Sequence, residues 1–340
     1  MEKGVFAELR LLRFDKTKQE MQGLENQAQA ESRLLVDRLC THTVLEVKHS
    51  SRDSLMECIT DAMTDPPADA SLKTHTMIFR SGLSSNSLFR LQNALNRPDC
   101  PIRELQFVSL RNEEQIQLAL QCCRQEHCKI ERIRLQQYRP SGRLSREDRQ
   151  SVAKTLRDGI FGLEFAENSG ALPSVTIVEL VGYPIGAEGA RILTDAVAQN
   201  KTLDTLRLMD CDLRGDSMYY IAQMIRHNSH LRELDLSYNK HYLGSPLTQE
   251  MTIKTLVNKG LKYNHTLQQL RMNSQGGRIN RSKIDRHLSV NRFCHDFVSN
   301  NRDPFTIPEP VWPCVIARVT AQPSALHKFL RENAVALFGN

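Results

Sequence analysis

A short apolar pattern recurs along this chain at a fixed distance, and it restricts the possible folds more than any other feature. Leu203, Leu206, Leu208 and Cys211 follow the spacing L-x-x-L-x-L-x-x-(N/C), and the same spacing begins again at Leu231 and ends at Asn239. It is typical of a short strand with inward-facing leucines, followed by a turn whose Asn or Cys bonds to the backbone. A strand, two loops and a three-turn helix need about 28 residues, which is the period from Leu203 to Leu231, so alternating strands and helices are predicted.

Five further segments place apolar residues in the same slots. Their first positions are Thr74, Ile102, Ile130, Val175 and Leu267. Most neighbouring copies are one period apart, whereas the steps from Ile130 to Val175 and from Leu231 to Leu267 are longer and contain insertions. Stacked copies share one core, and parallel strands need a helical crossover, so the sequence predicts an α/β solenoid. We expect parallel strands on its concave face and helices on its convex face.

The repeat pattern divides the chain into three parts. Residues 1–40 are rich in Glu, Gln, Arg and Lys and predict an N-terminal helical cap, partly disordered, with a coiled coil as the alternative. Residues 41–275 predict the solenoid, with insertions near 139–172 and 241–250, and begin with a degenerate repeat whose strand is 41–47. Residues 276–340 predict a C-terminal helical capping region, because a bare last repeat would expose a leucine stripe.

Three asparagines lie shortly before the first leucine of a strand, where a helix has to end. They are Asn200, Asn228 and Asn264. Asn tolerates the left-handed conformation that often ends a helix, so we expect these residues to adopt it.

Composition indicates a protein that is neither strongly basic nor membrane-spanning. The 340 residues carry 45 basic and 39 acidic side chains, which are interspersed, so nucleic-acid binding is not favoured. No stretch approaches the ~18 apolar residues of a membrane span, and the N-terminus lacks the apolar run of a signal peptide. Nine scattered cysteines fit reduced thiols, so we expect a cytoplasmic location, with the nucleus as the alternative.

The chain resembles the ribonuclease-inhibitor-like leucine-rich repeat proteins. The resemblance depends on the period of the repeat, on the run Val178-Glu-Leu-Val-Gly-Tyr-Pro-Ile-Gly-Ala-Glu-Gly-Ala-Arg-Ile-Leu, and on Leu203-Asp-Thr-Leu-Arg-Leu and Leu231-Arg-Glu-Leu-Asp-Leu-Ser-Tyr-Asn. It covers residues 70–275 best. It implies a horseshoe whose concave strand face binds proteins, and it does not imply ribonuclease binding.

Strand positions between the inward leucines point to the concave face, because side chains of a strand alternate. These positions supply arginine, methionine and tyrosine, which are enriched in protein interfaces, together with interrupting carboxylates that argue against a nucleic-acid groove. The predicted protein-binding residues are Arg132, Arg134, Glu179, Arg207, Met209, Glu233, Asp235, Tyr238 and Arg271.

No motif in the sequence marks a catalytic, metal or cofactor site. Cys122, Cys123, His127 and Cys128 lack the C-x2-C pairing of a zinc site and fit buried or turn-capping thiols better. The glycines from Gly182 to Gly189 lack both G-x-G-x-x-G and the phosphate-binding lysine, and they fall where each repeat has to turn. We therefore predict no cofactor and no catalytic residues.

The function that this sequence indicates is an intracellular, non-catalytic scaffold that binds a protein partner by its concave strand face. The alternative is a GTPase-activating protein of the Ran-directed leucine-rich repeat type, although no motif marks that activity. A ubiquitin-ligase substrate receptor would need an F-box-like helical segment, and residues 1–40 are too short and too polar for one.

Overall fold

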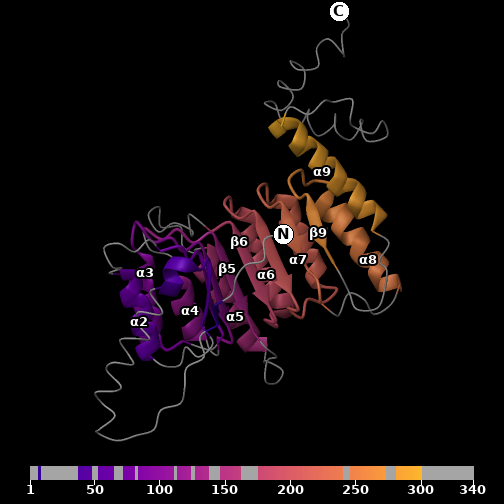
Figure 1. Ribbon diagram of the computed structural model, residues 1–340. Helices are drawn as coiled ribbons and strands as arrows, with labels where there is room; N and C mark the ends of the chain where they lie inside the picture. The colour runs from indigo at the N-terminus through magenta and orange to yellow at the C-terminus, as the bar shows by residue number, and fades with distance from the viewer. Residues whose placement is uncertain are drawn as a thin grey trace, which may run out of the picture. The chain divides into compact units, whose positions relative to one another are not determined.

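A computed structural model shows the arrangement of strands and helices (Figure 1). The structure describes residues 7–8, 37–47, 53–64, 72–80, 83–110, 113–123, 127–137, 146–161, 175–239, 246–272 and 281–300. The chain divides into two compact units, Met1–Ile185 and Gly186–Asn340, which are described separately.

The first unit alternates strands with helices along the chain. Its strands are β1 (Ala7–Glu8), β2 (Val44–Val47), β3 (Thr76–Phe79), β4 (Glu104–Val108), β5 (Arg132–Gln136) and β6 (Ile177–Val181). Its helices are α2 (Asp53–Thr64), α3 (Ser85–Leu95), α4 (Glu113–Gln121) and α5 (Arg146–Phe161). The strands pair in parallel in chain order, and each helix packs against the next.

The strand register of the first unit confirms the repeat period. Thr76 pairs with Glu104, and Glu104 pairs with Arg132, so both steps equal the period read from the sequence. Arg132 pairs with Ile177, so the longer predicted step lies between the strands and leaves the pairing of equivalent positions unchanged. Because the side-chain period of a strand is two, this register keeps the same slots buried in every strand.

Strand β1 was not predicted from the sequence. Ala7 pairs with Leu45 and Glu8 pairs with Glu46, in a stretch for which the polar composition predicts a helical cap. The two residues extend the parallel ladder by one strand. Helix is described only at residues 37–41, so the rest of the cap predicted for 1–40 lies outside the described residues.

The second unit continues the same alternation with its own strands and helices. Its strands are β7 (Thr205–Met209), β8 (Glu233–Asp235) and β9 (Gln269–Arg271). Its helices are α6 (Gly186–Gln199), α7 (Ser217–His227), α8 (Pro246–Leu256), the π-helix η2 (Val257–Leu261) and α9 (Ser282–Asn300). Thr205 pairs with Glu233, which confirms a step of one period from β7 to β8. Glu233 pairs with Gln269, which confirms the longer predicted step from β8 to β9.

The core of each unit consists of aliphatic side chains at matched offsets. In the first unit Leu105, Ile133 and Val178 are buried at paired positions of β4, β5 and β6. In the second unit Leu206, Leu234 and Leu270 are buried at paired positions of β7, β8 and β9. Each ladder, with the helices that alternate with its strands, has the architecture of a leucine-rich repeat solenoid, as the sequence predicts.

A ladder of buried asparagines joins the repeats of the second unit. Nδ2 of Asn228 donates to the carbonyl oxygens of Val197 at 2.6 Å and Asn200 at 3.0 Å, and its Oδ1 accepts from the Leu231 N–H at 2.6 Å. Asn264 repeats this arrangement, donating to the carbonyl oxygens of Ile225 and Asn228.

The expectation of a left-handed backbone at these asparagines is wrong. Asn228 is extended, with φ −78° and ψ 131°, and neither Asn200 nor Asn264 is among the residues with positive φ. A side-chain amide provides two donors and an acceptor, so the asparagines join neighbouring repeats with their side chains while the backbone stays in an ordinary region.

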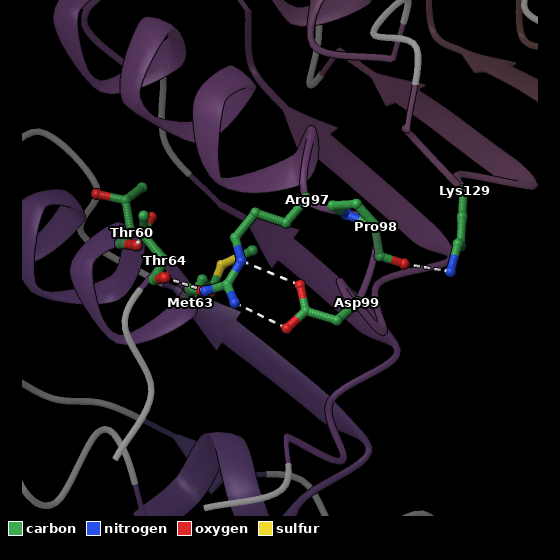
Figure 2. Close-up of polar contacts among 7 residues, drawn as sticks. All are labelled: Thr60, Met63, Thr64, Arg97, Pro98, Asp99 and Lys129. Carbon is green, nitrogen blue, oxygen red and sulfur yellow. Dashed lines mark hydrogen bonds and ion pairs between the residues drawn. The ribbon is translucent and has the colours of Figure 1, made fainter. Parts of the chain in front are cut away.

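In the first unit, the side chain of Arg97 connects two neighbouring repeats (Figure 2). Its Nη1 donates to the carbonyl oxygen of Met63 at 2.7 Å and also to that of Thr64, the last residue of α2. Asp99 holds the guanidinium through two contacts of 3.0 and 2.7 Å, and Lys129 of the next repeat donates to the carbonyl oxygen of Pro98. A cation at the carbonyl end of a helix is stabilising, so Arg97 caps α2.

Two predicted insertions fall partly on described residues. The longer one, 139–172, contains α5, and the shorter one, 241–250, contains the start of α8; residues 138–145, 162–174 and 240–245 lie outside the described residues. Helix α9 packs on η2 and α8. The capping role of 276–340 remains a prediction, because residues 301–340 also lie outside the described ones.

None of the described helices is both long enough and apolar enough to cross a membrane.

Candidate functional site

Polar side chains of the first unit, all half-buried except the buried Glu179, form a surface that we call the first open face. It consists of Glu104 and Gln106 on β4, Arg132, Arg134 and Gln136 on β5, and Glu179 on β6. These residues alternate with the buried aliphatic side chains, so they lie on the other side of the same strands.

Two arginines and two carboxylates form a charge network on the first open face. Nη1 of Arg132 lies 3.2 Å from Oε1 of Glu104, its direct cross-strand partner. Nη1 of Arg134 lies 3.5 Å from Oε2 of Glu179, and Nε of Arg132 lies 4.0 Å from Oε1 of the same carboxylate. The network contains two charges of each sign and is therefore neutral.

Glu179 is buried rather than exposed, which the sequence did not indicate. Only 2% of its surface is accessible, whereas the Arg132 and Arg134 side chains keep 36% and 35%. A buried carboxylate is stable only when it is paired, so Glu179 fixes the positions of two arginine side chains that reach solvent. It therefore positions the two arginines, which are the more accessible members of these pairs.

The first open face extends beyond the residues predicted from the sequence. Glu46 on β2 is half-buried and accepts from Nε of Arg80 at 2.6 Å. Glu46 pairs with Ile78, which pairs with Gln106, and Gln106 pairs with Arg134. The repeat period could have placed β3 on this face, because Ile78 precedes Gln106 by one period. The preceding step, from Glu46 to Ile78, is longer than the period and concealed it.

The second unit carries a corresponding surface, the second open face. It consists of Arg207 and Met209 on β7, Glu233 and Asp235 on β8, Tyr238 in the turn after β8, and Gln269 and Arg271 on β9. Nη2 of Arg207 lies 3.9 Å from Oε2 of Glu233. With its amide oriented to suit its neighbours, Gln269 donates to Glu233 at 3.2 Å and accepts from Arg271 at 2.8 and 2.9 Å.

The predicted residues of the second open face differ in accessibility. Asp235 is buried, and its Oδ1 accepts from the backbone N–H of Ser237 at 2.8 Å, so it shapes the turn. Arg207, Met209 and Glu233 are half-buried, and Arg271 is exposed. Tyr238 is 54% exposed and has a φ of 64°, a backbone region that is costly for an aromatic residue. Strained exposed residues are often found at functional sites.

Asn239 fixes the turn that presents Tyr238. Its Oδ1 accepts from the N–H groups of Cys211 at 2.8 Å and Leu213 at 3.1 Å, and its Nδ2 donates to the carbonyl oxygen of Leu208 at 2.6 Å. This confirms that the Asn of the repeat pattern bonds to the backbone loop. The same contacts anchor the residue that follows Tyr238 and so fix where the tyrosine projects.

The cysteines considered as zinc ligands are core residues. Cys122 and Cys123 are buried, and Sγ of Cys122 donates to the carbonyl oxygens of Leu88 and Leu118 at 3.3 Å. Burial raises the pKa of the Cys122 thiol to about 12. Across the described part of the chain, no three His, Cys, Asp or Glu side chains gather as metal ligands would.

Gly182 serves the turn between strand and helix, as predicted for this glycine-rich run. It has a φ of 75°, and a Cβ there would lie 2.3 Å from the carbonyl oxygen of Gln137. The close approach of two backbones requires glycine at this position.

Comparisons with known proteins identify the repeat. The family model described as Leucine Rich repeat matches residues 227–240, which include β8 and Asn239. No curated protein matches the chain. Among solved structures, Leiomodin-1 Actin-Binding Site 2 (ABS2) is similar over 55% of this chain and 90% of its own, with 15% identity and a TM-score of 0.36.

The fold is of a kind that commonly serves as a scaffold for protein binding. The parallel ladders and the alternating helices give this chain the fold of a leucine-rich repeat solenoid, and the family model matches one of its repeats.

Proposed function

We propose that this protein is an intracellular, non-catalytic scaffold that binds a protein partner through the open faces of its strands. The observation that supports it most directly is the pairing of two half-buried arginine side chains with the buried carboxylate of Glu179. Side chains that are already fixed lose little conformational entropy when a partner docks, so a broad polar face binds without a deep pocket.

The composition of the two open faces supports a protein as the partner. Arginine, methionine and tyrosine are over-represented in protein interfaces, and Arg134, Met209 and Tyr238 provide all three types. Glu104, Glu179 and Glu233 accompany the arginines and neutralise them, which disfavours the phosphate backbone of a nucleic acid.

Two finer assignments belong to the same proposal. The single-period register of β3, β4 and β5 supports the ribonuclease-inhibitor-like subtype of the repeat. The buried thiols of Cys100, Cys122 and Cys211, none of which is in a disulfide, fit a reducing compartment such as the cytoplasm or nucleus.

The proposal is tested with a variant that changes only exposed contact residues. Arg271→Gln removes a charge, and Tyr238→Asn removes an aromatic ring while suiting the positive φ at that position. The matched control is Arg191→Gln with Phe89→Asn, an exposed arginine and an exposed aromatic on helices α6 and α3.

Affinity purification with quantitative mass spectrometry compares the wild type with both variants. We expect at least one protein to be recovered by the wild type and the control but strongly reduced with the open-face variant. Equal recovery by all three folded proteins would reject the open face of the second unit as the binding surface. Nothing in the described residues favours the GTPase-activating alternative. If the wild-type chain stimulated GTP turnover by a GTPase, that alternative would be supported and the non-catalytic scaffold would be rejected.

A further inference from the structure

We propose that the second unit carries another binding surface, on the outer side of α7 and η2, for an acidic polypeptide segment. This surface, the cation–tyrosine strip, consists of Tyr219 and Arg226 on α7, Lys259 on η2, and Lys262 and Tyr263 directly after η2. It lies on helices rather than strands, so it is separate from the open faces.

Cations lie over the exposed tyrosine rings of the strip. Cζ of Arg226 is 4.4 Å from the ring centroid of Tyr263, and Nζ of Lys262 is 5.9 Å from the same ring. Nζ of Lys259 is 5.0 Å from the ring centroid of Tyr219. Both tyrosines are 46% exposed, and contacts of this kind hold a cation in place at an exposed site.

The two cation–tyrosine pairs lie along the contact between α7 and η2. Tyr219 and Arg226 share one face of α7 and are separated by two helical turns, about 10 Å. Gly260 allows the backbones to approach, because a Cβ there would lie 2.9 Å from the carbonyl oxygen of Ala222. The π-helical turn that contains Gly260 interrupts the regular spacing, and such turns are frequent at functional sites.

No carboxylate of the described residues forms an ion pair with the cations of the strip. Within the described residues, Arg226, Lys259 and Lys262 form cation–π contacts but no ion pairs. The nearby α8 carboxylate Glu250 pairs with Lys254 of the same helix at 2.9 Å. An acidic ligand on the strip therefore gains ion pairs without breaking existing ones.

Three of the open-face arginines differ from the cations of the strip. Arg132, Arg134 and Arg207 each pair with a glutamate of a neighbouring strand. An acidic ligand at the open faces would have to compete with these carboxylates, so the strip is the better site for it.

The geometry favours a polypeptide over a nucleic acid or a membrane. Cations already cover the ring faces of Tyr219 and Tyr263, which reduces the aromatic surface for stacking a base. The residues that make up the strip include no aliphatic side chain to enter a lipid surface. A helical segment places carboxylates about 10 Å apart on one side when they are two turns apart.

The test measures binding of a fluorescein-labelled, glutamate-rich peptide to the 340-residue chain by fluorescence anisotropy. We expect saturable binding that weakens with added salt, and none for the matched glutamine-rich peptide. Arg226→Gln combined with Lys259→Gln removes one cation from each pair and is expected to weaken binding about tenfold or more. Circular dichroism checks that the variant is folded.

A control variant removes the same charge from neighbouring helices. Arg191→Gln on α6 and Lys254→Gln on α8 alter cations that already have carboxylate partners, and binding should stay within about twofold of the wild type. The open-face variant Arg271→Gln with Tyr238→Asn should also leave peptide binding unchanged, which separates this proposal from the scaffold function.

Three results would overturn the inference. The first is no saturable binding of the acidic peptide, and the second is equal weakening by the strip and control variants. The third is tighter binding of a single-stranded oligonucleotide, or of vesicles containing phosphatidylserine, that depends on Arg226 and Lys259.

Discussion

Nη1 of Arg134 lies 3.5 Å from Oε2 of Glu179, and the two residues face each other directly across β5 and β6. The carboxylate is almost fully buried, whereas about a third of the arginine side chain is exposed, at 35%. The pair thus connects the interior of the first unit to the surface proposed to meet a partner. A charge on that surface is held by the fold and does not move freely in solvent.

Replacing Arg134 is expected to destabilise the first unit. Arg134→Gln leaves the buried Glu179 carboxylate with Arg132 at 4.0 Å as its remaining cation among the ion pairs described above. Breaking a fully buried pair costs about 3–5 kcal/mol, and solvent screening of the exposed arginine reduces this to about 1–3 kcal/mol. Urea unfolding followed by circular dichroism measures the loss.

The control for this variant is Arg90→Gln, whose partner Glu57 lies 2.6 Å away with both side chains more than a third exposed, at 36% and 48%. Its cost should be below about 1 kcal/mol, because exposed pairs contribute little. Equal destabilisation by both variants would show that Glu179 does not depend on Arg134.

Replacing Asn228 is expected to loosen the contact between repeats of the second unit. Asn228→Ala removes two donated and two accepted hydrogen bonds at a buried position, and leaves the carbonyl oxygens of Val197 and Asn200 without this donor. Buried polar groups that lose a partner cost about 1–3 kcal/mol each, so a total loss of about 2–4 kcal/mol is expected.

Asn200→Ala is the comparison for Asn228, because its half-buried side chain accepts from Thr202 and Leu203 within one loop. Chemical denaturation should give it the smaller loss of unfolding free energy. A larger loss for Asn200→Ala would show that the ladder does not join the repeats.

Adding one methyl group at Gly260 should disturb the packing of α7 on η2. In Gly260→Ala the new Cβ would lie 2.9 Å from the Ala222 carbonyl oxygen and 3.3 Å from Cβ of Ile225, so backbone has to move. Overpacking of this kind costs about 1–3 kcal/mol. Differential scanning calorimetry should show a lower Tm.

Gly215→Ala offers a matched control, because no atom lies within 4 Å of the added Cβ. Gly215 is not among the glycines with positive φ, so the change should be neutral or stabilising by up to about 1 kcal/mol. A lower Tm for Gly215→Ala than for Gly260→Ala would contradict the packing argument.

Thiol labelling should distinguish buried cysteines from accessible ones. Burial raises the pKa of Cys122 to about 12, so near pH 8 only about one thiol in 10⁴ is ionised. Iodoacetamide should leave Cys122 unmodified in the native protein and label the half-buried Cys40 sooner. Peptide mass spectrometry measures both rates.

Full labelling of Cys122 after denaturation in urea is the control for reagent and detection. Rapid labelling of Cys122 in the folded protein would mean that the α4 region opens readily. Because the thiolate is the reactive form and the pKa of Cys122 is raised, labelling of this thiol in the native protein should increase as the pH is raised toward 12.

From β3 onward, the sequence by itself determined the order of strands and helices and, within each unit, the register that joins the strands. Leu206, Leu234 and Leu270 align because a shift of one residue in the pairing would turn these apolar side chains to the solvent face of the sheet. The two longer predicted steps were correct for the same reason, since an insertion between strands leaves the slots within them unchanged.

Tertiary structure alone decided which polar residues of the open faces are accessible. Alternation places Glu179 and Arg134 on one face, but burial depends on neighbouring strands, and these bury Glu179 while leaving Arg134 in solvent. The asparagine ladder and the cation–tyrosine strip could not be predicted from the sequence either, because the contacts that join their elements link residues about one repeat apart or more. A local pattern gives the direction of a side chain, whereas its partners are fixed only when the repeats stack.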